Sequence, residues 1–103
     1  MIKPTTFWFA GFFIFMIGIY KITSPTGKVY IGQSIDIEKR FYNYRKIRCK
    51  NQRILYNSFL KHGFESHVFE IIEECCVEEL NTIERYYQDL YSVIGSNGLN
   101  GRL

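Results

Sequence analysis

The sequence of 103 residues is poor in the residues that form disulfides and zinc sites. Its three cysteines, Cys49, Cys75 and Cys76, form no CxxC pair, and neither histidine lies at a metal-ligand spacing from them. This pattern argues against a disulfide framework and a structural zinc site. Free thiols behave as small apolar side chains and are typical of a reducing compartment. We therefore expect an intracellular, cytoplasmic protein.

The sequence also lacks an apolar segment long enough to cross a bilayer. Its longest apolar run, residues 7–17, has eleven residues, whereas a membrane-spanning helix needs about 20. No small-residue cleavage site follows the run, which argues against a signal peptide. We interpret residues 1–17 as a hydrophobic N-terminal extension and Met16 as the natural start of the chain. A membrane-surface anchor formed by residues 7–17 is the competing interpretation.

A third deficit is local, because acids are missing from one long segment. Residues 39–61 contain eight Lys or Arg and no acid, whereas residues 65–89 contain eight acids and one base. Such segregation gives a folded domain a positive face that attracts polyanions. Two ordinary solvated helix surfaces would produce the same pattern. The 47% hydrophobic and 17% aromatic content favours one folded domain with a modest core.

The segment that begins at Gly18 predicts a β-hairpin. Residues 18–23 and 28–33 are rich in Ile, Val, Tyr and Thr, and the turn formers Pro25-Thr26-Gly27 lie between them. A three-residue loop pairs Tyr20 with Gly32 across the strands. Because side chains alternate along a strand, Tyr20, Tyr30 and Lys28 then share one face. A loop one residue longer or shorter would place the two tyrosines on opposite faces.

The remaining periodicities predict three helices and one more strand. We expect helices over residues 36–48, 52–63 and 77–91 and a strand over residues 67–74. The first two helices should bury Ile37, Phe41, Tyr44, Ile54, Leu55 and Phe59. The predicted fold is a small α/β (α+β) domain over residues 18–103, with a three-stranded, largely antiparallel sheet flanked by about three helices.

The third predicted helix contains one carboxylate in an unexpected place. At about 100° per residue, one arc of this helix is apolar, and Glu84 falls inside that arc. The apolar residues of the arc are Val77, Leu80, Ile83, Tyr87, Leu90 and Tyr91. A partly desolvated carboxylate needs a cation, a hydrogen-bond donor or an edge position open to water. The alternative is a glutamate that reaches water from the rim of the arc.

Five segments, in order, resemble the GIY-YIG nuclease domain over residues 18–100. These segments are GIYKITSPTGKVYIGQS, IEKRFYNY, LYNSFLKHGFESHVFEIIEE, ELNTIERYYQDLY and NGLN. Two tripeptides alone recur by chance, but five segments in the right order are specific. One departure is the run Thr82-Ile83-Glu84, where many homing members have ERE, so only the last carboxylate of that run is present.

The resemblance implies a role for each matching residue. Tyr20 lies beside the nucleophilic water in the family and is a candidate general base, and Tyr30 also lies in the active site. Arg40 is the candidate that holds the scissile phosphate, and Tyr44 occupies a position where members have histidine or tyrosine. Glu84 is the candidate ligand of a single divalent cation, Mg²⁺ or another such as Mn²⁺. Two further residues complete the implied site: Lys28 near the water and Asn100 as a supporting residue.

These implications lead to one expected function and two alternatives. We expect a divalent-metal-dependent endonuclease that hydrolyses DNA, of the phage or mobile-element homing type, with no small-molecule cofactor. Homing members usually add a separate DNA-targeting region, so a targeting domain or protein is an expected partner. The alternatives are a non-catalytic nucleic-acid-binding module and a membrane-associated protein anchored by residues 7–17. The candidate DNA-binding residues are Lys39, Arg45, Lys46, Arg48, Lys50, Arg53 and Lys61.

Overall fold

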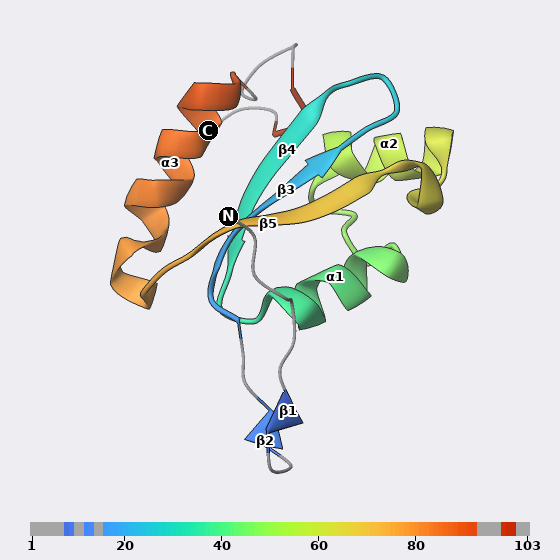
Figure 1. Ribbon diagram of the computed structural model, residues 1–103. Helices are drawn as coiled ribbons and strands as arrows, with labels where there is room; N and C mark the ends of the chain where they lie inside the picture. Colours follow the sequence, from blue (N-terminus) through green and yellow to red (C-terminus); the bar gives the residue numbers. More distant parts are fainter. Residues whose placement is uncertain (1–7, 10–11, 14–15, 93–97, 101–103) are drawn as a thin grey trace.

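The computed structural model describes residues 8–9, 12–13, 16–92 and 98–100 (Figure 1). Its main sheet has three antiparallel strands in the order β4-β3-β5. The strands are β3 (Gly18–Thr23), β4 (Val29–Ser34) and β5 (Val68–Glu74). The helices are α1 (Ile37–Arg45), α2 (Arg53–His62) and α3 (Leu80–Tyr91), with short 3-10 turns at η1 (Phe64–Ser66) and η2 (Val77–Glu79). This arrangement confirms the predicted fold class.

A small separate ladder precedes the sheet. It pairs β1 (Trp8–Phe9) with β2 (Phe12–Phe13) in antiparallel fashion. In the described parts of the chain, no helix has the length and apolar character needed to cross a membrane.

The hairpin has the predicted loop and register. Tyr20 lies opposite Gly32, and the Ser24 amide donates to the Lys28 carbonyl over 2.8 Å. Gly27 has a φ of 89°, a left-handed conformation that glycine adopts without steric cost. The three-residue loop therefore places Tyr20 and Tyr30 on one face, as predicted, although β4 runs one residue later than expected.

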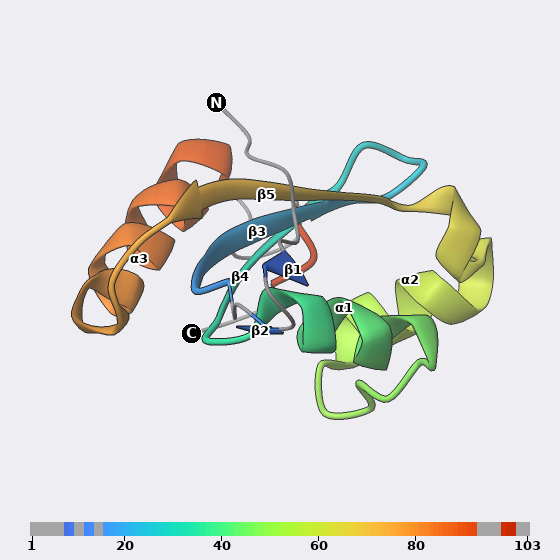
Figure 2. The same ribbon diagram turned by 60° about the horizontal axis from the view of Figure 1, so that its bottom comes forward.

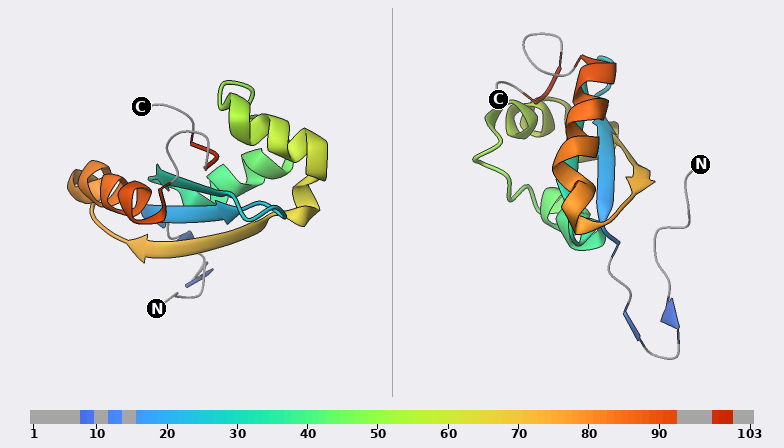
Figure 3. Two further views of the ribbon diagram at one scale, coloured as in Figure 1. Left: turned by 90° about the horizontal axis from the view of Figure 1, so that it is seen from above. Right: turned by 90° about the vertical axis from the view of Figure 1, so that its left-hand side faces the viewer.

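The alternating side chains of the sheet contribute to two separate cores. On one face, Tyr20 and Ile22 pack with Tyr44 of α1 and with Leu55 and Phe59 of α2. On the other face, the core consists of Ile19, Ile31 and Leu80, with Ile83 and Tyr87 of α3 packed against it. Figure 2 accordingly shows α3 and the α1–α2 pair on opposite sides of the strands, and Figure 3 gives two further views of this arrangement.

Met16 and Ile17, the last two residues of the predicted N-terminal extension, pack against the domain. Met16 is only 5% exposed, and its carbonyl accepts a 3.0 Å hydrogen bond from the Ile37 amide at the start of α1. Ile17 packs against the core on the α3 side. The structured domain therefore includes two residues that precede Gly18.

The first two helices differ from their predictions in two details. Helix α1 ends at Arg45 rather than near Arg48, because Ile47 adopts a left-handed φ of 55° and turns the chain. In the following loop, Cys49 is 2% exposed. In α2, Leu55 and Phe59 are buried as predicted, but Ile54 is 42% exposed. Helix α2 therefore buries fewer of its apolar side chains than the sequence predicted.

The predicted start and buried face of the third helix are also corrected. It begins as the 3-10 turn η2, so Val77 does not follow the α-helical period, and its side chain is 53% exposed. Leu90, near the end of α3, is 58% exposed, whereas Gln88 is buried. Because α3 packs mainly on the edge strand β4, only a narrow stripe of the helix is covered.

Candidate active site

Three predicted site residues meet between β3 and α1. The Tyr20 hydroxyl lies 2.6 Å from the Tyr44 hydroxyl, and Nη1 of Arg40 donates to the Tyr20 hydroxyl over 3.4 Å. Residues four apart on a helix lie one above the other, so α1 directs Arg40 and Tyr44 to the same place. Helix α1 starts where it does because the Asp36 side chain accepts from the Lys39 amide and caps it.

Burial governs the chemistry of the Tyr20 hydroxyl. The Tyr20 side chain is fully buried and that of Tyr44 is 1% exposed. Burial, and then the neighbours Tyr30 and Tyr44, raises the pKa of Tyr20 well above its usual value, and the Arg40 charge opposes this rise only in part. The Tyr20 hydroxyl is therefore protonated near neutral pH. Its role as a general base stays a prediction that this environment does not favour.

Tyr30 lies beside Tyr20 because Gly32 leaves room for both rings. The two ring centroids are 6.1 Å apart. A Cβ atom at position 32 would lie 2.5 Å from the Tyr20 ring and 2.8 Å from that of Tyr30. The glycine of the second tripeptide is therefore required by the close approach of the first tyrosine.

Gln52, at the N-terminus of α2, was missed by sequence reasoning. Its side-chain Nε2 donates a hydrogen bond to the Tyr30 hydroxyl. Position 52 shows no motif or pattern that would indicate this contact, because a helix N-cap residue is selected for many local reasons. The bond connects α2 to Tyr30, on which the charge of the site's carboxylate also acts.

That carboxylate belongs to Glu84, which α3 presents at the edge of the sheet. Nε2 of Gln33 donates to Oε1 of Glu84 over 2.8 Å and to Oδ1 of Asn81 over 2.8 Å. Gln33 lies on the edge strand β4 and so holds Glu84 at that edge, where the Glu84 charge also acts on Tyr30. Burial, then Tyr44 and the Glu84 charge, raises the pKa of Tyr30. The inward carboxylate predicted from the sequence is thus partly buried and bound to an amide.

The surroundings of Glu84 fit one type of metal ion. Within the described ranges, no cluster of three His, Cys, Asp or Glu residues could bind a metal, and Glu84 has no cationic partner. Mg²⁺ is usually bound through one or two carboxylates and retains several waters, so a single carboxylate suits it. A closed structural zinc site would need four protein ligands. Glu84, with Asn81 beside it, therefore fits a hydrated hard cation.

Asn100 and Lys28 occupy different kinds of position. The Asn100 side chain forms two hydrogen bonds with Ile31 of β4: its Oδ1 accepts from the amide over 2.8 Å, and its Nδ2 donates to the carbonyl over 2.7 Å. Asn100 therefore supports the strand that carries Tyr30. Lys28 is exposed beside the hairpin loop, and the cation bonded to Tyr20 is Arg40.

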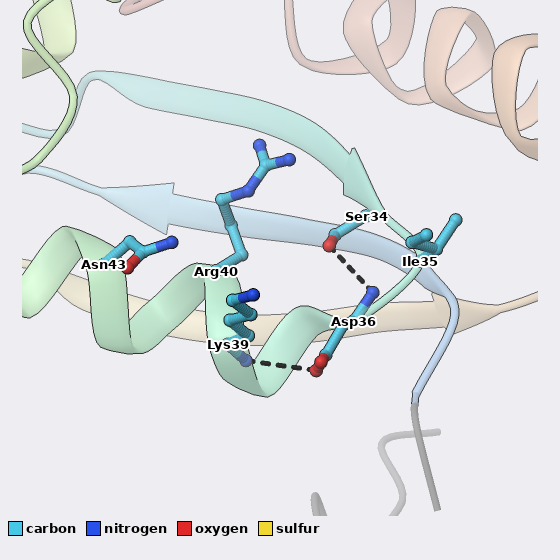
Figure 4. A pocket seen from close by; sticks show the side chains of 6 residues that line it. All are labelled: Ser34, Ile35, Asp36, Lys39, Arg40 and Asn43. Carbon is cyan, nitrogen blue, oxygen red and sulfur yellow. Dashed lines mark hydrogen bonds between the residues drawn. The ribbon is translucent and has the colours of Figure 1, made fainter.

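Next to Arg40 is a hollow of about 380 Å³. It lies between the start of α1 and the end of β4, and Figure 4 shows its lining residues. The lining consists of Ser34, Ile35, Asp36, Lys39, Arg40 and Asn43. Arg40 connects this hollow to the buried tyrosines, because its guanidinium group also reaches Tyr20.

The candidate DNA-binding cations are all exposed. They lie on α1 and α2 and on the loop between these helices, which is one side of the sheet (Figure 2). Nζ of Lys46 lies 5.5 Å, and Cζ of Arg48 5.9 Å, from the centroid of the Tyr42 ring. The full set is Lys39, Arg45, Lys46, Arg48, Lys50, Arg53 and Lys61.

Comparison with known proteins agrees with this fold. The sequence profile of the GIY-YIG catalytic domain matches residues 16–100. The chain therefore belongs to the GIY-YIG family, whose catalytic domain is a nuclease that hydrolyses phosphodiester bonds.

A solved structure with the same fold is that of the catalytic domain of the homing endonuclease I-TevI. The two chains are 28% identical and superimpose with a TM-score of 0.70. The aligned region covers 82% of this chain and 96% of the other. A search of curated proteins finds no match.

Proposed function

We propose that this chain is the catalytic module of a divalent-metal-dependent DNA endonuclease of the homing type, encoded by a phage or mobile element. The likeness to the I-TevI catalytic domain supports the homing assignment. The observation that carries the proposal is the cluster of Arg40 with two buried tyrosines, together with a partly buried glutamate on α3 of the same domain.

The side chains of the site suggest a division of labour. Arg40 presents a planar guanidinium that binds a phosphate through two parallel hydrogen bonds. Tyr20 and Tyr44 are buried behind Arg40, and the bond from Arg40 to the Tyr20 hydroxyl orients the guanidinium. Tyr20 therefore acts by positioning Arg40. Tyr30 is only partly buried, and its hydroxyl is the better placed of the two motif tyrosines to orient the attacking water.

Glu84 is the residue that would hold the metal ion. A hydrated Mg²⁺ or Mn²⁺ ion, when bound there, supplies Lewis-acid stabilisation of charge on the phosphate and leaving oxygens. Gln33 fixes the orientation of the carboxylate through its hydrogen bond to Oε1, so that Oε2 is available. Asn100 and Lys28 have supporting roles, at strand β4 and at the surface of the hairpin.

Plasmid nicking tests the proposal directly. We expect the chain to nick supercoiled DNA in Mg²⁺ and not in EDTA. Glu84→Ala should reduce cleavage to background, because it removes the metal-binding carboxylate. Arg40→Ala should slow cleavage by about 100-fold or more, the usual cost of losing one stabilising contact to a developing charge.

Two matched variants make the outcome specific. Arg40→Lys keeps the charge without the planar fork and should recover only part of the rate. Glu78→Ala removes an exposed carboxylate of η2 and should cleave like the wild type. Circular dichroism checks that each variant is folded. Undiminished cleavage by Glu84→Ala would refute the site assignment, and DNA binding without any cleavage would favour the non-catalytic binding module.

Targeting is proposed to come from elsewhere. The contacts expected of the exposed cations on α1 and α2 are with phosphate, and such contacts carry no sequence information. We therefore propose a separate DNA-targeting domain or protein as the partner that selects the cleavage site. Random positions of nicks made by this chain alone would support that division.

A further inference from the structure

The hollow beside Arg40 contains donors that the proposed catalytic roles do not use. Asn43 Oδ1 accepts from Nη1 of Arg48 over 3.5 Å, which leaves the Asn43 amide N–H groups available. Ser34 Oγ accepts from the Asp36 amide over 2.9 Å, so its own O–H can donate elsewhere. Among the residues that the structure describes, the Lys39 ammonium takes part in no ion pair.

The charge of the hollow favours an anion. Its two cations are Lys39 and Arg40, and its one acid is Asp36. The Asp36 carboxylate already accepts from the Lys39 amide over 3.1 Å as the cap of α1. Because Arg40 is assigned to the scissile phosphate, Lys39 is the cation that remains for a second phosphodiester group, whose single negative charge it matches.

The geometry separates this group from the phosphate that Arg40 is proposed to hold at the cleavage point. Arg40 reaches inward to Tyr20, whereas Lys39 and Asn43 lie one turn apart on the outer surface of α1 (Figure 4). Ile35, which is 62% exposed, forms an apolar part of the wall. A sugar ring is the part of a nucleotide that suits such a surface.

We propose that this hollow binds the phosphodiester group adjacent to the one that is cleaved. Lys39 and the Asn43 amide contact its oxygens, and the Ser34 hydroxyl donates from the floor. This inference rests on the proposed function, because the scissile phosphate is assigned to Arg40 there. The subsite reads no base, so its effect is to hold the strand in register while Arg40 engages the neighbouring group.

The test combines a protein change with a matched change in the DNA. The DNA is a short duplex with a mapped cut position, in which one flanking phosphate at a time is a neutral methylphosphonate. Binding is measured in EDTA by fluorescence anisotropy at several KCl concentrations. For wild-type protein, we expect one flanking methylphosphonate to weaken binding and to lower the slope of log K against log salt by about 0.9.

Lys39→Gln should reproduce that loss and that smaller slope on unmodified DNA. On the duplex with the effective methylphosphonate, Lys39→Gln should add no further loss, because the charge it contacts is already absent. Lys50→Gln, which alters an exposed cation of the α1–α2 loop outside the hollow, is the matched control. Its loss should be equal on both duplexes. If Lys39→Gln and the flanking methylphosphonate weaken binding additively, the subsite is refuted. It is also refuted if no flanking methylphosphonate weakens binding.

A second measurement needs no cleavage and so distinguishes failure of the subsite from failure of the proposed function. The ¹⁵N-labelled chain is titrated with a short thymidine oligonucleotide, and the side-chain amide signal of Asn43 is followed. The signal should shift in wild type and in Glu84→Gln, and the shift should be lost in Lys39→Gln. A shift without nuclease activity would keep the subsite and refute the nuclease. Nuclease activity with a stationary Asn43 signal would refute the subsite alone.

Discussion

At the scale of single residues, the site depends on how deeply its tyrosines are buried. The sequence identified Tyr20 as a site residue, but a motif contains no information about solvent access. The structure places its hydroxyl between Tyr44 and Arg40, where it is fully buried. A buried phenol resists ionisation, so burial favours a positioning role for Tyr20 over proton abstraction.

This burial predicts a loss of stability at alkaline pH. The folded pKa of Tyr20 is raised, so above about pH 10, where an unfolded tyrosine ionises, the unfolded chain releases a proton that the folded chain keeps. Stability is therefore complete below that pH and falls as pH rises toward the folded pKa. The contribution of Tyr20 to the slope of the unfolding free energy is about 1.4 kcal/mol per pH unit.

Tyr20→Phe should remove that share of the slope, measured by denaturant unfolding at a series of pH values. Tyr30 has a raised pKa as well, so part of the slope remains in this variant. Tyr42→Phe is the control, because the Tyr42 side chain is 51% exposed and meets water in both states. Equal slopes for Tyr20→Phe and wild type would contradict the proposed burial of the hydroxyl.

Residues that act through a distant partner were the ones that sequence reasoning missed. Gln33 and Glu84 are 51 positions apart, and Gln52 and Tyr30 are 22 positions apart. An amide side chain has no preferred partner that a single sequence could indicate. The tyrosines, Arg40 and Glu84 were found because they belong to motifs or interrupt a periodic pattern.

At the scale of elements, local turn chemistry was predictable and element ends were not. The three-residue loop with Gly27 at positive φ determined the register of β3 and β4 from adjacent residues alone. The end of α1 depends instead on the left-handed conformation of Ile47, a residue that rarely adopts it. Such a conformation is imposed by surrounding structure, and no neighbouring glycine or proline indicated it.

Strand β4 depends on Asn100, near the end of the sequence. Among the strands that the structure describes, β4 is at the edge of the sheet, and the Asn100 side chain binds both the amide and the carbonyl of Ile31. Asn100→Ala should lower the unfolding free energy by about 1–3 kcal/mol, because two partly buried backbone groups lose their partner. Hydrogen exchange should accelerate at the Ile31 amide in particular.

Asn100→Asp distinguishes pairing from packing in this prediction. A carboxylate can accept from the Ile31 amide but repels the Ile31 carbonyl, so this variant should retain at most one of the two bonds. Asn51→Ala, at an exposed loop position, should leave both stability and exchange at Ile31 unaltered. If Ile31 exchanges equally slowly in Asn100→Ala and wild type, Asn100 does not support β4 in solution.

At the scale of the whole molecule, the two charge blocks of the sequence become two sides of the domain. The basic block forms α1, α2 and their connecting loop, whereas the acidic block forms β5, η2 and α3 (Figure 2). The sequence predicted the segregation but not the orientation of the active site relative to it. Arg40 lies on α1, on the basic side, and bonds to Tyr20. Glu84 lies on α3, on the acidic side, and bonds to Gln33 of the edge strand β4.

This layout predicts that DNA approaches over α1 and α2. Replacing Lys50, Arg53 and Lys61 together by Gln should lower the slope of log K against log salt by up to about 2.7, because each phosphate contact contributes about 0.9. Glu78→Gln with Glu79→Gln, on the acidic side, should leave the slope unchanged. The measurement is fluorescence anisotropy over a KCl series in EDTA. An unaltered slope in the triple variant would mean that DNA does not approach over α2 and the α1–α2 loop, which would contradict this layout.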